Sequence, residues 1–386
     1  MTVTAKPQPA YALPFHTPHR SPLQALYVTQ ALQHGHLRPN GPFFQRARSW
    51  LADHTGAGQV VLTNSCTAAM EIAALALELG PADEVIVPTF TFCASATAFE
   101  RTGAHIVFCD IDPSTMMLNP ADLKRHLSNR TRVIVVTHYG GASAEMEAIL
   151  VIAKKRGIQI VEDAAQGFGT TRADRPLGSF GAFGAYSFHE TKVVSCGQGG
   201  ALAVNTNDPA LLDRVTSIVE RGTDFARVRS GEKAFYEWTG PGSSFQMGEL
   251  EAAILCAELE ALQDNLAARR RIALKLLKGI AELSLPLSIL TPDAQTNSNF
   301  HFVPVLARSA SKAGDLIAHL QTCGIDCRQH YVPLHLSPRA KTKGYNREVL
   351  PAAEQTWDRM VRLPVHTDMS EQDVGTLLAA LNAWMG

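Results

Sequence analysis

Short apolar runs alternate with helix-like segments between residues 59 and 205. The runs are VVLT from position 60, EVIVP from 84, HIVFCD from 105, VIVVTHY from 133, IQIVED from 158, FGAYSF from 183 and ALAV from 201. Several are apolar at consecutive positions, as is typical of strands covered on both faces. The alternation predicts an α/β domain whose sheet is largely parallel and sandwiched by helices.

The helical segments indicate a second, smaller domain. Residues 68–79 and 144–156 read as helices within the first domain. Residues 247–285, rich in Ala, Leu, Glu and Arg without proline, form a long stretch of good helix propensity that bridges to the second domain. A strand from 300, a helix over 311–323, a strand from 324 and a helix after Ser370 follow. We expect a large domain over residues 1–262, with an extended proline-containing N-terminal arm, and a small α/β domain over residues 263–386.

Composition narrows the class of protein. The 386 residues carry 35 Lys and Arg against 36 Asp and Glu, a net charge of −1, so no overall field favours nucleic acid or an anionic membrane. The seven cysteines show no CxxC spacing, which argues against a disulfide framework and a zinc site, and no metal is expected. No apolar run reaches the roughly 20 residues that span a bilayer, and no signal peptide is recognisable. These features predict a soluble, cytoplasmic protein.

The first candidate for chemistry is a lysine behind a predicted strand end. In GAYSFHETKVVSCGQGGALAV, Ser187 ends the strand and Lys192 follows five residues later. Open α/β sheets bind ligands at the loops that leave strand carboxyl ends. A lysine in that place can form a Schiff base with a cofactor aldehyde, although a lone lysine is more often a surface residue.

Three other strand ends carry groups that suit the same cofactor. Asp163 in VEDAAQG can face a protonated pyridine nitrogen, and Gln166 can bind a phenolic oxygen. Thr67, at the start of the helix after VVLTNS, can bind a phosphate together with backbone N–H groups. Phe92 offers an aromatic face. Each residue alone is better explained as a cap, a turn or core, but their joint occurrence in one domain predicts a pyridoxal-phosphate site.

The motifs NSCTAAMEIAAL, THYGGASAEM, VEDAAQG, SFHETK, GSSFQMGELEAA and HYVPLH carry a resemblance. From about Gly35 to the C-terminus the chain resembles the DegT-type sugar-nucleotide aminotransferases, which are fold type I pyridoxal-phosphate enzymes. Within them it is most similar to transaminases of dTDP-4-keto-6-deoxyglucose. The resemblance implies a homodimer with shared active sites, and it assigns roles to particular residues.

The resemblance implies that Lys192 is the Schiff-base lysine, that Asp163 pairs with the pyridine nitrogen and that Gln166 meets the phenolic oxygen. It implies that Phe92 stacks on the ring. The phosphate is then held by Cys66, Thr67 and Ser187, together with Ser244 of the second chain. Ser244 stands where relatives commonly have Asn. Val193, Gln198 and Gln246 replace the usual Asn, Glu and Arg, which puts the substrate in doubt. His330 and His335 match positions that face the sugar, but both are also compatible with structural roles.

The resemblance implies amino transfer from L-glutamate to a keto-deoxysugar on a nucleotide. A sugar dehydratase is one alternative, but its relatives replace the lysine with histidine, whereas Lys192 is present. Sulfur transfer by Cys196 is another, and no neighbour in sequence activates that thiol. A cyclitol-type ketone substrate and a non-catalytic sensor on the same fold stay open. The identity of the nucleotide is not encoded in these motifs.

Overall fold

The computed structural model describes residues 11–345 and 348–384. Its centre is a seven-stranded sheet in the order β1-β9-β8-β5-β4-β2-β3. The strands are β1 (Gln59–Thr63), β2 (Glu84–Pro88), β3 (His105–Cys109), β4 (Thr131–Thr137), β5 (Gln159–Asp163), β8 (Phe183–Ser187) and β9 (Gly200–Val204). Strand β9 runs opposite to the other six strands, which all point the same way. The α/β prediction and its seven strands are confirmed.

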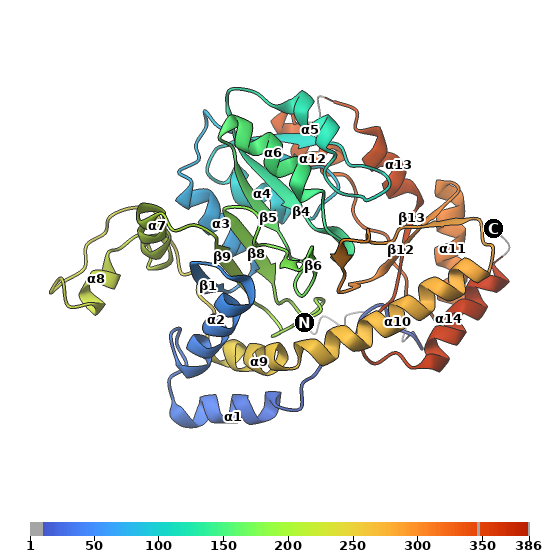
Figure 1. The fold of residues 1–386 in the computed structure, drawn as a ribbon, viewed down its shortest axis with the longest axis horizontal. Coiled ribbons are helices and arrows are strands. Elements are labelled where there is room, and N and C mark those ends of the chain that lie inside the picture. Colours follow the sequence, from blue (N-terminus) through green and yellow to red (C-terminus); the bar gives the residue numbers. More distant parts are fainter. Residues whose placement is uncertain (1–10, 346–347, 385–386) are drawn as a thin grey trace, which may run out of the picture.

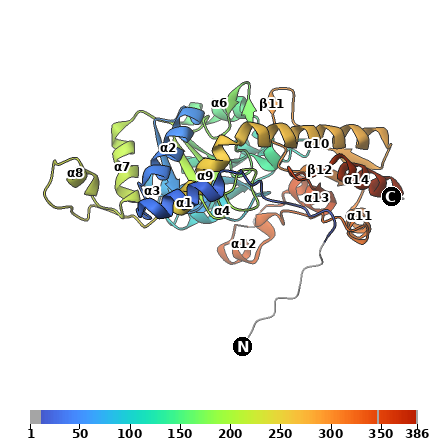
Figure 2. The same ribbon diagram turned by 90° about the horizontal axis from the view of Figure 1, so that it is seen from below.

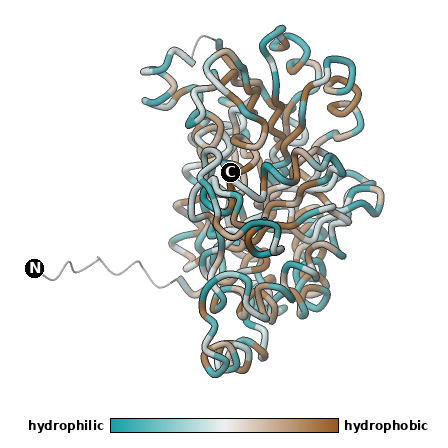
Figure 3. Tube along the Cα trace, turned by 90° about the vertical axis from the view of Figure 1, so that its left-hand side faces the viewer, coloured by the Kyte–Doolittle hydropathy of each residue, from teal (hydrophilic) through white to brown (hydrophobic). Residues whose placement is uncertain are grey.

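Helices pack on both faces of this sheet (Figure 1). They are α1 (Gln24–His34), α2 (Pro42–Thr55), α3 (Cys66–Ala76), α4 (Ala94–Glu100), α5 (Pro120–His126), α6 (Met146–Arg156) and α7 (Pro209–Val219). The short α8 (Phe225–Arg229) lies away from the sheet (Figure 1) and has no buried residue. Strand β2 shows why its apolar residues are consecutive. Val85 and Val87 belong to the core with α3 and α4, whereas Ile86 belongs to the core with α6 on the other face. Along the chain, hydrophobic segments concentrate in the interior (Figure 3).

Two consecutive helices lead from the sheet toward the C-terminal part (Figures 1 and 2). They are α9 (Glu249–Glu260) and α10 (Leu262–Glu282). The stretch of good helix propensity over 247–285 forms two helices, because Ala261 leaves the helical conformation with φ −90° and ψ 4°. No proline or glycine marks this break, so the sequence carries no local signal for it.

The C-terminal part has its own three-stranded sheet, in the order β10-β12-β13. Its elements are β10 (Leu287–Ile289), β12 (Val303–Ala307), α11 (Ala310–Thr322), α12 (Pro338–Lys343), α13 (Pro351–Arg359), β13 (Met360–Leu363) and α14 (Glu371–Ala383). The predicted strand from 324 does not form, because Ile325 and Arg328 make only single bridges, to Leu13 and Arg362. Strand β13 was not predicted.

The remaining elements are short. Two of them are the 3-10 helices η1 (Tyr139–Gly141) and η2 (Leu334–Leu336). The other three are the strands β6 (Thr171–Arg172), β7 (Arg175–Pro176) and β11 (Thr296–Asn297), and these strands form a small sheet in the order β11-β6-β7. Of the expected N-terminal arm, residues 1–10 lie outside the described residues. The part that follows reaches the C-terminal half, where the Leu13 N–H donates to the Gly324 carbonyl (3.0 Å). Among the described helices, none has the length and apolarity to cross a membrane, and all seven cysteines are unpaired.

Candidate active site

The carboxyl ends of the sheet strands surround a cavity of about 320 Å³. Strands β1, β2, β4, β5 and β8 all point to this edge, where open α/β sheets bind ligands. Eight of the ten residues singled out in the sequence line the cavity: Cys66, Thr67, Phe92, Asp163, Gln166, Ser187, Lys192 and His330. The fold therefore brings together side chains that are up to 264 positions apart, from 66 to 330.

Lys192 lies on the loop between β8 and β9. Its backbone N–H donates to the His189 carbonyl (2.9 Å), which fixes the loop beneath the cavity. Burial lowers the pKa of Lys192, and the negative charge of Asp163 acts in the opposite direction. Lowering the pKa increases the fraction of neutral amine, which is the nucleophilic form that attacks a carbonyl carbon.

Asp163 ends β5 and is held by donors on both carboxylate oxygens. Ser95 Oγ donates to Oδ2 (2.5 Å), and the Ala165 backbone N–H donates to Oδ1 (3.1 Å). Asp163 is 4% exposed and Ser95 is fully buried. Ser95 was not among the predicted site residues. Behind it, Thr91 Oγ1 lies 2.9 Å from Ser95 Oγ and 3.0 Å from Thr137 Oγ1, so a chain of hydroxyl groups runs from β4 to the carboxylate.

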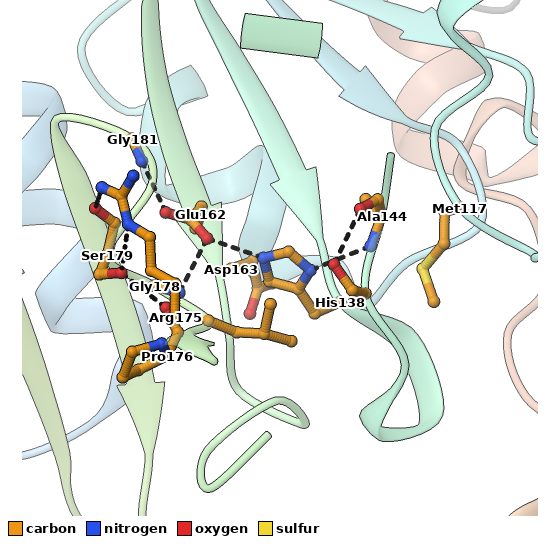
Figure 4. Close-up of polar contacts among 12 residues, drawn as sticks. Met117, His138, Ala144, Glu162, Asp163, Arg175, Pro176, Gly178, Ser179 and Gly181 are labelled. Atoms are coloured by element: carbon orange, nitrogen blue, oxygen red, sulfur yellow. Dashed lines mark hydrogen bonds and ion pairs between the residues drawn. The ribbon is translucent and has the colours of Figure 1, made fainter. Parts of the chain in front are cut away.

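A buried hydrogen-bonded pair, Glu162 and His138, supports the same strand end from the opposite face (Figure 4). Glu162 precedes Asp163, and its side chain has no exposed surface; Glu162 Oε2 lies 2.9 Å from Nε2 of the equally buried His138. Glu162 also accepts hydrogen bonds from the N–H groups of Gly178 (2.8 Å) and Gly181 (2.6 Å). The backbone N–H of His138 donates to the backbone carbonyl of Asp163 (3.1 Å). Together these contacts limit the freedom of β5 where it delivers Asp163.

The turn from β1 to α3 presents a helix N-terminus to the cavity. Ser65 caps α3 by accepting a hydrogen bond from the Ala68 N–H (3.1 Å). The N–H groups of the first helical turn lack partners within the helix, so with the Thr67 hydroxyl they can bind an anion. Gly200 on β9 permits this close packing, because a Cβ there would lie 2.5 Å from the Cys66 nitrogen.

Two aromatic rings form a wall of the cavity. Phe92 is 54% exposed, and its ring centroid lies 5.9 Å from that of Tyr331. Gln166 Nε2 donates to the Tyr331 hydroxyl (3.0 Å), while its Oε1 accepts from the Gly140 N–H (2.7 Å). Tyr331 was not singled out in the sequence, although it lies inside the motif HYVPLH.

Two predicted site residues lie outside the cavity lining. Ser244 lines an adjoining cavity of about 510 Å³, which shares Ser65 and Thr67 with the first. His335 is 2% exposed, with Nδ1 2.7 Å from Thr89 Oγ1 and Nε2 3.1 Å from Glu354 Oε1. These contacts fit the structural alternative for His335.

Another cavity, of about 370 Å³, lies between residues 114–116, 139–148 and the C-terminal part. The cation on its wall, Arg172, is already ion-paired with Glu147 (3.0 Å) and Asp293 (2.6 Å). No lysine lines it. Although this cavity is larger, it has no lysine that could carry a cofactor aldehyde, and the cavity at the strand ends is the better catalytic candidate.

In the described part of the chain, three residues with potential metal ligands come together. These are Cys109, Asp122 and His126, whose ligand atoms lie within 4.8 Å of one another. The Cys109 thiol, the Asp110 N–H and His126 Nε2 all contact Asp122 Oδ2, at 3.4, 2.8 and 3.1 Å. Hydrogen bonding to one carboxylate oxygen accounts for this convergence without an ion.

Comparison with known proteins gives matches over nearly the whole chain. Residues 21–382 match the model of the DegT/DnrJ/EryC1/StrS aminotransferase family. The spore coat polysaccharide biosynthesis protein SpsC of Bacillus subtilis (strain 168) is 32% identical over 379 residues, which covers 96% of each chain. The aminotransferase TlmJ of Streptoalloteichus hindustanus superposes with a TM-score of 0.86 at 29% identity, over 97% of both chains.

A further structural relative bears on the cofactor. Spr1654 of Streptococcus pneumoniae, known in a PLP form and a PMP form, superposes with a TM-score of 0.89 at 25% identity, over 96% of this chain and 98% of that one. The fold and these matches define a pyridoxal-phosphate-dependent aminotransferase. The chain belongs to the DegT/DnrJ/EryC1/StrS aminotransferase family.

The groups around the cavity fit this cofactor chemically. An amine for the aldehyde, a carboxylate for the ring nitrogen, helix N–H groups for the phosphate and an aromatic ring for the pyridine face all line one space. The volume of about 320 Å³ lies within the usual range of small-molecule sites.

Proposed function

We propose that the protein transfers an amino group from L-glutamate to a keto-deoxysugar carried on a nucleotide, of the dTDP-4-keto-6-deoxyhexose class. The observation that carries this proposal is the convergence of Lys192, Asp163 and Thr67 on one cavity in a chain of this aminotransferase family. Bound pyridoxal phosphate supplies an electron-poor ring that accepts the electron pair released when an amino-acid carbon loses its proton. The protein supplies binding, orientation and proton transfer.

Several residues hold the cofactor in this proposal. Asp163 faces the ring nitrogen with a carboxylate that Ser95 and Ala165 already orient. The start of α3 and the Ser187 hydroxyl receive the phosphate, because both border the cavity. Phe92 covers one face of the ring, since more than half of its surface is free for a ligand.

Lys192 moves the proton. With the cofactor bound, Lys192 would both carry it and serve as the base beside the reacting carbon. Burial lowers the pKa of Lys192, so that its neutral Nζ would be able to take the proton from the amino-acid carbon and give it back. In the return half of the cycle the same atom works in reverse, so no second base is required.

A sugar substrate is supported by the roles that the names of two relatives state. SpsC is a protein of polysaccharide biosynthesis, and Spr1654 is provisionally named a sugar aminotransferase. His330 lines the cavity, and burial lowers its pKa to about 4. At neutral pH His330 is therefore uncharged, which suits a hydrogen bond to a sugar hydroxyl better than an ion pair.

We further propose a homodimer in which Ser244 contributes to the phosphate site of the second chain. Ser244 borders the adjoining cavity and not the one with Lys192. The preceding segment, which contains α8, projects from the body of the molecule (Figure 1) and carries Phe235 and Trp238, each 84% exposed. Exposed aromatic residues of this kind are typical of surfaces that another chain covers, and a closed two-fold dimer is the commonest assembly.

The test is turnover with a panel of substrates. The purified protein with pyridoxal phosphate is incubated with L-glutamate and keto-sugars linked to dTDP, UDP or GDP, and 2-oxoglutarate is measured. We expect 2-oxoglutarate to appear with a dTDP-linked 4-keto-6-deoxyhexose, and Lys192→Ala to abolish it. Turnover with a cyclitol ketone alone would replace the nucleotide-sugar assignment, and no turnover with any ketone would favour a sensor.

A further inference from the structure

The loop that carries Lys192 spans residues 188–199, between β8 and β9. It is closed at its base, because the backbone N–H of Glu190 donates to the Gly197 carbonyl (2.9 Å). On either side of Lys192 a backbone carbonyl points out of the loop, that of Glu190 before it and that of Val193 after it. Both carbonyls accept a hydrogen bond from a side chain outside the loop.

Asn265 binds the carbonyl that follows Lys192. Its Nδ2 donates to the Val193 carbonyl (2.8 Å). Because a carbonyl oxygen only accepts, this partner fixes which end of the amide is the nitrogen. Asn265 lies in the first turn of α10, where its backbone N–H donates to the Ala261 carbonyl (3.1 Å), and it is 1% exposed. The start of α10 after the helix break therefore determines where the loop is held.

Packing alone does not explain an asparagine at position 265. The neighbouring Leu262 and Leu266 belong with Val193 to one apolar core. Within the described part of the chain, the buried Oδ1 atom of Asn265 has no hydrogen-bond partner. An apolar side chain of similar size would fit such a core without leaving a polar oxygen unpaired. The hydrogen bond to the loop of Lys192 is therefore what the amide contributes.

His16 binds the carbonyl on the other side of Lys192. Its Nε2 lies 2.6 Å from the Glu190 carbonyl oxygen. Burial and the positive charge of Arg269 lower the pKa of His16 to about 4, so the ring is neutral at pH 7. The neutral ring has one N–H, and because the carbonyl only accepts, this proton is on Nε2 and is donated to Glu190.

The N-terminal segment that carries His16 is fastened on both sides of this residue. Before it, the Leu13 N–H donates to the Gly324 carbonyl (3.0 Å) in the C-terminal part. After it, His19 Nδ1 lies 2.6 Å from Oε2 of Glu258 on α9, whose side chain has no exposed surface. His16 is thus held between two parts of the fold and offers the loop a fixed contact.

We propose that Asn265 and His16 are positioning residues, which hold Lys192 where it can bond to the cofactor. This inference rests on the proposed role of Lys192 as the residue that carries the cofactor. Neither side chain lines the cavity, so both act through the loop. An amine must meet an aldehyde carbon within a narrow range of distances and angles, and a misplacement of about 1 Å can slow a reaction about 100-fold. Loss of one neutral hydrogen bond should cost less, about 3- to 10-fold.

Cofactor loading separates the position of the lysine from the shape of the pocket. Pyridoxamine phosphate has the ring and the phosphate of the cofactor but an amine in place of the aldehyde, so it fills the pocket without bonding to Lys192. Its affinity for the cofactor-free protein is measured by calorimetry. The rate of Schiff-base formation with saturating pyridoxal phosphate is measured by stopped-flow absorbance.

The variants Asn265→Leu and His16→Phe each remove the donor and keep a similar volume. Each should slow Schiff-base formation about 3- to 10-fold and leave the affinity for pyridoxamine phosphate within about twofold. His16→Gln should restore the rate to within about twofold, because the glutamine Nε2 lies as many bonds from the backbone as the histidine Nε2. The matched control is His319→Phe, since His319 Nε2 also contacts a carbonyl oxygen, that of Ala380 (2.8 Å), but between α11 and α14. It should change neither quantity.

Two results would overturn the positioning role. One is an equal loss of Schiff-base rate and of pyridoxamine phosphate affinity, which would indicate general damage to the pocket. The other is an unchanged rate in both Asn265→Leu and His16→Phe. If Asn265→Leu does not fold, the comparison of His16→Phe with His16→Gln decides, because only the first lacks the donor.

Lys192→Ala distinguishes failure of this inference from failure of the proposed function. A Schiff base that still forms in Lys192→Ala would reject the proposed role of Lys192. A Schiff base that requires Lys192 but forms at an unchanged rate in Asn265→Leu and His16→Phe would reject this inference alone. Slower Schiff-base formation at unchanged pyridoxamine phosphate affinity, without turnover of any ketone, would support the positioning role and reject the proposed sugar aminotransfer alone.

Discussion

Replacing Ser95 with alanine tests how Asp163 is held. The substitution keeps the Cβ atom and removes one oxygen, the donor to Asp163 Oδ2 (2.5 Å). Among the described residues Oδ2 has no second hydrogen-bond donor, whereas Oδ1 keeps the Ala165 N–H (3.1 Å). The site is closed, because Ser95 is fully buried and Asp163 is 4% exposed, so water has little access to replace the lost donor.

The magnitude follows from the charge of the acceptor. A hydrogen bond to a charged group contributes about 1.5–3 kcal/mol. If this amount is lost from the orientation of Asp163 in the transition state, the rate falls about 10- to 150-fold, since each ~1.36 kcal/mol is a factor of ten. Cofactor content should change little, because the substitution leaves the proposed phosphate site at α3 and the proposed link to Lys192 untouched.

The assay is kcat/KM in both half-reactions together with cofactor content by absorbance. Ser143→Ala is the matched control, because Ser143 is also buried but donates to a neutral acceptor, the Ala144 carbonyl (2.8 Å). In an Asp163→Asn background the Ser95→Ala effect should shrink to a small factor, because the charged acceptor is gone. Equal losses in the Ser95→Ala and Ser143→Ala proteins, or an undiminished Ser95→Ala effect in the Asp163→Asn background, would refute a positioning role.

Three further predictions address the cofactor and the assembly. Borohydride should bleach the absorption of the holoprotein and attach the cofactor covalently to Lys192; peptide mapping that finds another lysine would contradict this assignment. Asp163→Asn should retain bound cofactor but lose most turnover, and near-normal turnover would make Asp163 a turn residue only. Inactive Lys192→Ala and Ser244→Trp chains should regain activity when mixed, because one site of the mixed dimer then has Lys192 from one chain and Ser244 from the other. Subunit exchange confirmed by mass without recovery of activity would mean that Ser244 acts within its own chain.

Much of the large domain could be predicted because its strands are specified locally. All seven strands of the central sheet fall on apolar runs visible in the sequence. The reason is that a strand buried on both faces must be apolar at consecutive positions, as Val85, Ile86 and Val87 are. Residues at the ends of such strands, including Asp163 and Ser187, could therefore be placed at one edge of the sheet from the sequence alone.

Features that depend on packing between distant segments were not predicted. The helix break at Ala261 has no proline or glycine, and the segment from 324 alternates like a strand but meets only single bridging partners. Ser95 and Tyr331 join the site because of tertiary contacts to Asp163 and Gln166, and a lone serine or tyrosine carries no pattern for that. For His335 the sequence left a sugar contact and a structural role open, and only tertiary packing shows that Thr89 and Glu354 contact its ring nitrogens.

The central sheet positions the residues on one side of the cavity, and the C-terminal part positions those on the other side. We expect this difference to affect which substrates are accepted. Lys192 and Asp163 are delivered by the central sheet, and Asp163 is fixed from one face by Ser95 and from the other by the buried pair of His138 and Glu162. The groups on the other side of the cavity, His330 and Tyr331, come from the C-terminal part, whose approach to the sheet depends on how α10 and the N-terminal segment pack. Changes near residues 328–336 should therefore alter which substrate is accepted while leaving the proposed proton-transfer residue intact. Changes at the strand ends should slow amino transfer for every substrate alike, because in the proposed mechanism those side chains hold the cofactor that all substrates share.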